Sequence, residues 1–343
     1  MSNSIQDRIT KIVDSFYIHS QFSFSINGNK PVQLPNNTGT TPAEQIGHYL
    51  PRDPLTRELQ SLFYRKYCSA DNSVESGNDQ IDPSIFASQL SAANKSIEGW
   101  DHGWNVYQTT ANGSLSIQKG DRHRTVYPGE YVTSGPPGTM VKVGTVVSVR
   151  VVRESFEIQQ GFYYVFGHTL SDQFDDHNLV RFYFNATPEG ALKIVHELTT
   201  ALNRFQVPFR FKTLSFPSSY NRTDAAVLYI ARRYFHIVAM SLQEVYERTL
   251  RLKSEIPLFT KKILPGIGIA EDPGTTESFG MHRCRLLAEG IVEAWKNGNQ
   301  QLSAKMEAIK KQFTSNGLDI EKPYLNKNSV DFLLPDITRG VEI

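Results

Sequence analysis

The N-terminal part of the chain repeats apolar residues at the spacing of amphipathic helices. The apolar positions recur every three or four residues in two groups, which are Ile5, Ile9, Ile12, Val13 and Phe16, and then Leu55, Leu59, Leu62 and Phe63. Asp82 followed by Pro83 is typical of the start of a third helix. Segments rich in Gly, Pro, Asn and Ser, residues 27–42 and 69–84, separate the helices. We therefore predict a mainly helical N-terminal region, residues 1–98.

After residue 98 the pattern changes to short runs of β-branched and aromatic residues divided by turn residues, which predicts mostly antiparallel strands. These runs are WNVYQT (104–109), GSLSIQ (113–118), TMVKVGTVVSVRVV (139–152), GFYYVFG (161–167), VRFYFN (180–185) and PFRFKT (208–213). Helices are predicted to start at Thr187 with Pro188, to run from Thr223 towards Arg248, to run from Ser278 to near Gly298, and to end before Gly317. Together these signals predict an α+β fold, in which residues 99–343 form a mixed core of mainly antiparallel strands flanked by C-terminal helices.

Two of the predicted strands place cations and a tyrosine on one face. Side chains alternate between the two faces of a strand, so Arg181, Tyr183 and Asn185 share one face of RFYFN. On FRFKTL the same rule places Arg210 and Lys212 together, opposite the phenylalanines. Cations gathered on one side of a sheet predict a site for a phosphate group.

A turn rich in Pro and Ser follows the second of these strands. It delivers Tyr220 and Arg222 just before Thr223, a good helix N-cap. Backbone amides at a helix N-terminus favour anions. The predicted phosphate site would thus combine guanidinium groups, phenols and the start of a helix.

Each of these residues also has a structural interpretation. Arginines beside aromatic residues often form ion pairs that support the fold, and Arg181 could pair with Asp224 or Glu271. Tyr220 and Tyr229 could be phenols at the edge of the core. For any one of these residues considered alone, the structural interpretation is the more frequent one.

The composition predicts a soluble, intracellular protein and adds little else to the picture. The chain of 343 residues carries 36 basic and 35 acidic side chains, a net charge of +1, so its overall field recruits neither nucleic acid nor an anionic membrane. The N-terminus lacks the pattern of a signal peptide, and no apolar run approaches the roughly 20 residues of a membrane helix. Cys68 and Cys284 are too few for a disulfide framework and are expected to be reduced, partly buried thiols.

Three tempting motifs do not meet the requirements of the sites they suggest. GPPGTMVKVGT (135–145) lacks the adjacent Gly and Lys and the following helix of a nucleotide-binding loop. The polar residues between His168 and His177 lack the spacing of a known zinc site and are expected to form a solvated loop. GIGIAEDPG (266–274) lacks the strand and helix of a dinucleotide fold and is expected to be a turn.

Several segments of the C-terminal half resemble a known family, the Hop A-type type III secretion effectors of plant-pathogenic bacteria. The segments are GFYYVFG (161–167), VRFYFN (180–185), PFRFKT (208–213), SYNRTDAAVLYI (219–230), LFTKKILPGIGIAEDP (258–273) and SFGMHRCRLLAEGI (278–291). Related proteins act in the pathways of class V lanthipeptides and thioviridamide-like compounds, as lyases that eliminate phosphate from phosphorylated Ser or Thr. A separate kinase-like protein supplies the phosphopeptide. The resemblance therefore implies a phosphothreonine or phosphoserine lyase that makes a dehydroamino acid.

Such an elimination needs a base, a phosphate clamp and a stabiliser of developing charge. Lys212 is the predicted base, because neighbouring arginines and partial burial lower the pKa of a lysine towards neutrality. The candidates for the phosphate clamp are Arg181, Arg222, Arg283 and Tyr220. The candidates for stabilising the enolate-like charge or donating a proton are His282 and Tyr183, with Lys261 and Lys119 as further phosphate or peptide ligands, and the sequence does not choose among them.

The resemblance also implies partners and a location. The expected partners are a phosphorylated precursor peptide and a kinase-like protein, and the elimination requires neither a metal nor an organic cofactor. The expected location is the bacterial cytoplasm, with secretion into a host if the chain is an effector. Two other functions stay open. One is a non-catalytic module that binds a phosphorylated or acidic peptide, and the other is a phosphatase, although no nucleophile or metal motif supports it.

Overall fold

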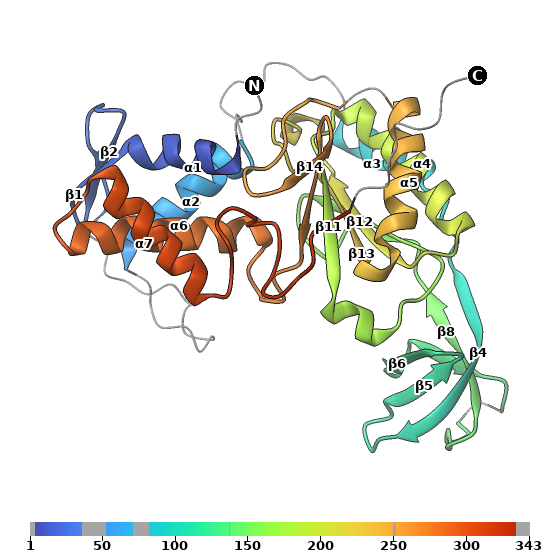
Figure 1. Ribbon diagram of the computed structural model, residues 1–343. Coiled ribbons are helices and arrows are strands. Elements are labelled where there is room, and N and C mark those ends of the chain that lie inside the picture. The colour runs from blue at the N-terminus through green and yellow to red at the C-terminus, as the bar shows by residue number, and fades with distance from the viewer. Residues whose placement is uncertain (1–3, 36–52, 71–81, 137, 250–251, 334–343) are drawn as a thin grey trace. The chain divides into compact units, whose positions relative to one another are not determined.

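The computed structural model describes residues 4–35, 53–70, 82–136, 138–249 and 252–333 (Figure 1). The chain divides into two compact units, each assembled from separate stretches of sequence. The first unit draws on Met1–Asn72, Pro257–Lys261 and Thr275–Asp331, and the second on Ser73–Ile256, Lys262–Gly274 and Phe332–Ile343. Helices together with mostly antiparallel strands confirm the predicted α+β class. The predicted domain boundary at residues 98 and 99 stays a prediction, because contact density does not test which segments fold independently.

The described residues of the first unit form four α-helices and a small sheet. Its described elements are α1 (Ile5–Asp14), β1 (Phe16–Ser20), β2 (Ser23–Ile26), β3 (Val32–Gln33), α2 (Pro54–Phe63), the π-helix η2 (Tyr64–Cys68), α6 (Phe279–Lys296) and α7 (Leu302–Ser315). Helix α6 packs against both α2 and α7, and α1 packs against α7. Gly290 permits the close approach of α7, because a Cβ atom at this position would lie 2.5 Å from the Cα atom of Ile309.

The prediction of a mainly helical N-terminal region is correct for its first two helices, but it did not include the small sheet. Helices α1 and α2 form with buried apolar faces that include Ile9, Val13 and Leu59. Phe16, however, is the first residue of β1, because α1 ends at Asp14 and the chain then forms a hairpin in which β1 pairs with β2. The predicted loops at residues 27–42 and 69–84 lie partly outside the described residues.

A seven-stranded sheet, in the order β14-β15-β11-β13-β12-β10-β9, is the centre of the second unit. Its strands are β9 (Glu154–Ser155), β10 (Phe162–Phe166), β11 (Leu179–Phe184), β12 (Phe209–Leu214), β13 (Ala226–Ala231), β14 (Lys261–Leu264) and β15 (Ile267–Glu271). The α-helices that the structure describes in this unit are α3 (Pro83–Ala93), α4 (Pro188–Arg204) and α5 (Phe235–Thr249), with α4 packed against both α3 and α5. One face of the sheet is apolar, and its Phe182 stacks on Phe235 of α5 with ring centroids 6.2 Å apart.

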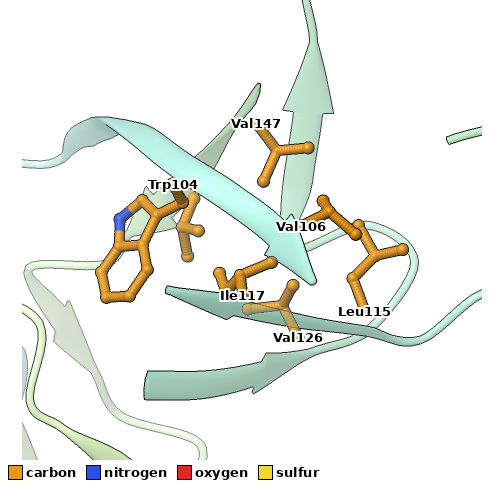
Figure 2. Packing of buried hydrophobic residues seen from close by; sticks show 7 residues of the cluster. Trp104, Val106, Leu115, Ile117, Val126 and Val147 are labelled. Atoms are coloured by element: carbon orange, nitrogen blue, oxygen red, sulfur yellow. The ribbon is translucent and has the colours of Figure 1, made fainter. Parts of the chain in front are cut away.

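A second sheet of five strands, in the order β6-β5-β4-β8-β7, belongs to the same unit. Its strands are β4 (Gly99–Thr109), β5 (Leu115–Lys119), β6 (Arg122–Val126), β7 (Tyr131–Thr133) and β8 (Val146–Val151). Figure 2 shows its core, where the indole of Trp104 lies with Val106, Ile117 and Val126 on one side of the strands. Trp104 and Ile117 are fully buried. The sequence predicted β4, β5 and β8 from their β-branched and aromatic runs, but it did not predict β6 and β7.

The prediction of one long helix from Thr223 towards Arg248 is wrong in its first part. Residues Ala226–Ala231 form β13, which lies between β11 and β12 at the centre of the sheet, and α5 begins only at Phe235. All six residues of β13 are buried, so the run is apolar on both faces and lacks the alternation that identifies a strand. The segment at 266–274, expected to be a turn, is likewise a strand for most of its length, since it contains β15.

The signals at helix ends were more reliable. Asp82, Thr187 and Ser278 each cap the N-terminus of a helix through a side-chain oxygen, as predicted. Helix α7 ends at Ser315, and Gly317 follows with a φ of +71°, a conformation that glycine adopts without strain. None of the described helices is long and apolar enough to cross a membrane.

Candidate functional site

The register of the central sheet brings the predicted cations of β11 and β12 onto one face. Tyr229 of β13 lies directly between Arg181 and Arg210, and Phe166 of β10 continues this row beyond Arg210. Two residues further along the strands, a second row consists of Tyr183, Val227, Lys212 and Tyr164. Because side chains repeat every two residues along a strand, both rows project from the same face. We call the polar members of these rows, with Arg222 and the carboxylates Asp224 and Asp272, the cationic cluster.

Lys212 lies at the centre of the second row, in a partly buried position. Its Nζ atom donates a hydrogen bond of 3.0 Å to Oε1 of Gln159, which also accepts a bond of 2.9 Å from the hydroxyl of Tyr164. The ammonium group also lies 4.5 Å from the ring centroid of Phe162. Burial, together with the positive charge of Arg181 and then of Arg210 and Arg222, lowers the pKa of Lys212 to about 8, although Asp224 acts in the opposite direction. This value agrees with the pKa that a base working near neutral pH requires.

Arg181 and Arg210 face the same phenol ring. The guanidinium carbon of Arg210 lies 4.6 Å from the ring centroid of Tyr229, and that of Arg181 lies 5.2 Å from it. Arg181 is largely buried and pairs with Asp272 through Nε at 2.7 Å and Nη2 at 2.6 Å. Arg210, in contrast, is exposed. It is therefore the guanidinium group of the sheet that is most accessible to an incoming anion.

Arg222 enters the cluster from the loop between β12 and β13. It forms a two-pronged ion pair with Asp224, with Nε at 2.5 Å and Nη2 at 2.9 Å from the two carboxylate oxygens. Since the start of β13 replaces the predicted helix, no helix N-terminus contributes at this point. The loop itself brings the guanidinium group close enough to influence the pKa of Lys212.

The cluster retains an excess of positive charge after these pairings. Its three arginines outnumber the two carboxylates, Asp224 and Asp272, by one charge when Lys212 is neutral and by two when it is protonated. A phosphate group carries about 1.5 to 2 negative charges at pH 7. The protonated cluster therefore matches one phosphate group in charge.

Two phenols of this face, Tyr183 and Tyr229, lie beside the arginines. Tyr183 is 6% exposed and lies close to Arg181. Burial lowers the pKa of Arg181, but Tyr183, Tyr229 and Asp272 together raise it above its usual value. Burial raises the pKa of Tyr229, while Arg181 and Arg210 oppose that rise. Tyr229 is thus protonated at neutral pH and can donate a hydrogen bond.

Sequence reasoning did not assign four members of this arrangement to the site: Tyr164, Tyr229, Gln159 and Asp272. Tyr229 has the correct position in its strand, and the signal was lost because the segment was interpreted as a helix. Arg181 was expected to pair with Asp224 or Glu271, and its partner is Asp272, the residue after β15. Gln159 belongs to an irregular loop, where no periodicity indicates the direction of a side chain.

Two predicted site residues of the second unit lie outside the cluster. The hydroxyl of Tyr220 is buried, donates to the carbonyl oxygen of Leu214 at 2.7 Å and lies 2.8 Å from the hydroxyl of Thr213. Because Thr213 alternates with Lys212, Tyr220 contacts the opposite face of the sheet, where its ring meets Phe86 of α3. Lys119 lies on β5 of the five-stranded sheet and forms an ion pair with Asp101.

Three other predicted site residues belong to the first unit, and each has local partners there. Arg283 is fully buried and donates to the carbonyl oxygen of Pro323 at 2.7 Å, while its Nη1 lies 2.7 Å from Nδ1 of His282. Lys261 pairs with Asp331 at 2.9 Å. These contacts hold the segment that follows α7 against the body of the unit. The structure does not bring these three residues together with Lys212 within one unit.

A pocket of about 540 Å³ adjoins the first row of the cluster. Arg210, Tyr229 and Phe166 line one part of it, and Arg124 and Arg150 of the five-stranded sheet line another. The loop between β9 and β10 joins the pocket to the base, because Ile158 lines the pocket and the next residue, Gln159, contacts Lys212. The cluster therefore opens into a cavity of the size that holds a drug-sized ligand.

About half of the chain matches a known protein family. The model of the HopA1 effector protein family matches residues 154–325, about half of the chain, including the whole cationic cluster. The effector protein from Pseudomonas syringae pv. tomato strain DC3000 has a similar structure, with 15% identity, a TM-score of 0.47 and coverage of 81% of this chain and 92% of that one.

A second similar structure is the effector protein from Pseudomonas syringae pv. syringae strain 61, with 13% identity, a TM-score of 0.45 and coverage of 80% of this chain and 95% of that one. No curated protein matches the chain significantly. The extent of the family match decides the assignment: the chain belongs to the HopA1 effector protein family.

Proposed function

We propose that this protein is a lyase that eliminates phosphate from a phosphorylated Ser or Thr of a peptide. The observation that carries the proposal is the amine of Lys212, whose pKa of about 8 sets it apart from an ordinary lysine and which lies among three arginines. At pH 8 about half of such amines are unprotonated, against well under 1% for a lysine with the usual pKa. A base and a phosphate-binding group thus lie on one face of the sheet.

Lys212 takes the proton from Cα of the phosphorylated residue. The electron pair of the broken Cα–H bond forms the Cα=Cβ double bond, and the Cβ–O bond breaks with its electrons leaving on the phosphate. The proton remains on Nζ of Lys212. Gln159 fixes the direction of that amine by accepting its hydrogen bond, so that a lone pair of the neutral amine can point towards the substrate. The reaction changes no net oxidation state and needs no organic cofactor.

The arginines hold the leaving phosphate. Arg210 is the accessible guanidinium group, and Arg181 lies behind it across the ring of Tyr229. Asp272 and Asp224 fix Arg181 and Arg222 in position before the substrate arrives, which lowers the entropic cost of binding. Tyr183, in the same row as Lys212, is the group that we assign to the enolate-like charge on the substrate carbonyl.

The bound phosphate also affects the base. A dianion beside Lys212 raises its pKa, while the arginines lower it. The acidic limb of the kcat/KM profile, which reports the free enzyme, should therefore lie near pH 8, and that of kcat should lie at a higher pH. The family suggests two further parts of this proposal. A kinase-like partner supplies the phosphopeptide, and the protein passes from the bacterial cytoplasm into a host.

Mass spectrometry of a phosphothreonine peptide after incubation with the full chain tests the proposal. Loss of phosphoric acid, leaving a dehydro residue to which a thiol adds, is the expected result. Lys212→Ala should abolish it, whereas Lys193→Ala, which removes an exposed lysine of α4, should not. Recovery of the free hydroxyl residue would indicate a phosphatase instead. A peptide that binds and remains unchanged, also when it carries its leader segment, would favour a non-catalytic binding module.

A further inference from the structure

The pocket beside the cationic cluster differs from the cluster in its charge. Its charged lining residues and their ion-pair partners comprise four basic side chains, Arg124, Arg150, Arg210 and Arg233, and four acidic ones, Glu98, Glu130, Asp175 and Asp176. The pocket as a whole is therefore formally neutral, whereas the cluster carries excess positive charge. An acidic peptide segment would gain little from this pocket, and a phosphate group would bind in the cluster.

The pocket also exposes apolar side chains that the fold leaves uncovered. Ile158 is 56% exposed and Val152 is 39% exposed, and both line the pocket together with Phe166 and Leu170. Burying such side chains against a ligand is favourable, at about 25 cal/mol for each Å² of apolar surface removed from water. The chemistry of the wall therefore suits an uncharged, apolar ligand.

The position of the pocket fits the residues next to a phosphorylated side chain. The row of Lys212 and the row of Arg210 are two residues apart along the strand, about 7 Å. The pocket begins at the row of Arg210. A peptide whose Cα lies at Lys212 and whose phosphate lies at Arg210 would thus place its neighbouring residue at the mouth of the pocket.

We infer that this pocket binds the residues that flank the phosphorylated Ser or Thr of the substrate peptide, and that it selects uncharged, apolar side chains there. The inference rests on the proposed function for the identity of the ligand. It adds a rule of specificity that a cluster of arginines alone would not give, because arginines alone would favour acidic neighbours.

Binding of two labelled phosphothreonine peptides, measured by fluorescence anisotropy, tests the inference. The peptides have equal length and carry either leucine or aspartate on both sides of the phosphothreonine. The full chain with Lys212→Ala serves for binding, so that no turnover occurs. We expect the leucine peptide to bind at least tenfold more tightly, which corresponds to about 1.4 kcal/mol.

A matched pair of variants places the effect in the pocket. Ile158→Asp should reduce the preference for leucine to less than threefold. Ile85→Asp, at an isoleucine of α3 that is 55% exposed and does not line the pocket, should leave the preference unchanged. Circular dichroism checks that both variants fold. If Ile158→Asp does not fold, the preference that the Lys212→Ala chain shows between the two peptides still decides the question.

Phosphate release by the wild-type chain, measured with the same peptides, separates this inference from the lyase proposal. A preference for the leucine peptide without any phosphate release would overturn the lyase proposal and support the inference about the pocket. Phosphate release from both peptides, with equal or tighter binding of the aspartate peptide, would overturn the inference about the pocket and leave the lyase proposal intact. Equal effects of Ile158→Asp and Ile85→Asp would also overturn the assignment of the pocket.

Discussion

Replacing Lys212 by methionine should make the protein more stable near neutral pH. Methionine keeps an unbranched side chain and removes the ammonium group. Burial and the nearby arginines lower the pKa of Lys212 to about 8 in the folded protein, whereas a lysine in the unfolded chain has a pKa of about 10.4. The unfolded state therefore binds this proton more tightly. Below pH 8, the protonated side chain lowers the free energy of unfolding.

The expected size follows from the difference between the two pKa values. The difference of about 2.4 between the two pKa values corresponds to about 3.3 kcal/mol. This is an upper limit, because solvent reaches the side chain and screens the charges, so we expect Lys212→Met to add about 1–2 kcal/mol at pH 7. The gain should decline as the pH rises through 8 and vanish near pH 10.5, because the native wild-type lysine is then neutral and the unfolded one loses its proton last.

Urea titrations followed by circular dichroism, at pH 7 and pH 9.5, measure the effect. Lys193→Met, at an exposed lysine of α4, is the control and should change the free energy of unfolding by less than about 0.5 kcal/mol at either pH. If Lys212→Met destabilises the protein at pH 7, or stabilises it equally at both pH values, the argument about the pKa of Lys212 is refuted.

Further substitutions test the charges around the base and the role of Tyr220. Asp224→Asn should lower the pKa of Lys212 further and move the acidic limb of the kcat/KM profile to lower pH, whereas Arg222→Gln should move it to higher pH. A shift in the same direction in both variants would contradict these charge assignments. Tyr220→Phe should lower the free energy of unfolding by about 1–2 kcal/mol, since a buried hydroxyl loses its hydrogen bonds. The same variant should keep its affinity for a phosphothreonine peptide, and a loss of affinity would return Tyr220 to the candidate site.

The face that carries the base was predictable, because the direction of a side chain in a strand depends on local geometry alone. Arg181 with Tyr183, and Arg210 with Lys212, were assigned to common faces from their spacing, and the register of the sheet agrees. The strand that lies between them was not predictable in the same way. A short run that is apolar at every position, such as Ala226–Ala231, fits a buried strand and a buried helix equally well.

The residues that sequence reasoning could not place depend on contacts between distant parts of the chain. Arg283 finds its hydrogen-bond acceptor 40 residues later, at the carbonyl of Pro323, and Arg181 finds its carboxylate 91 residues later, at Asp272. No local pattern encodes such pairs. The lowered pKa of Lys212 could be anticipated in direction, since the arginines were visible in the sequence, but its partner Gln159 could not.

The division of the first unit between the two ends of the chain has a consequence for biosynthesis. Helix α2 ends at Phe63, and α6, which covers it, begins at Phe279. At a synthesis rate of about 5–20 residues per second, the apolar face of α2 waits about 10–40 s for its partner. The seven-stranded sheet, in contrast, has all its strands once Ile267–Glu271 has been made. A chain truncated before residue 279 would therefore keep the complete central sheet together with N-terminal helices whose apolar faces have no cover.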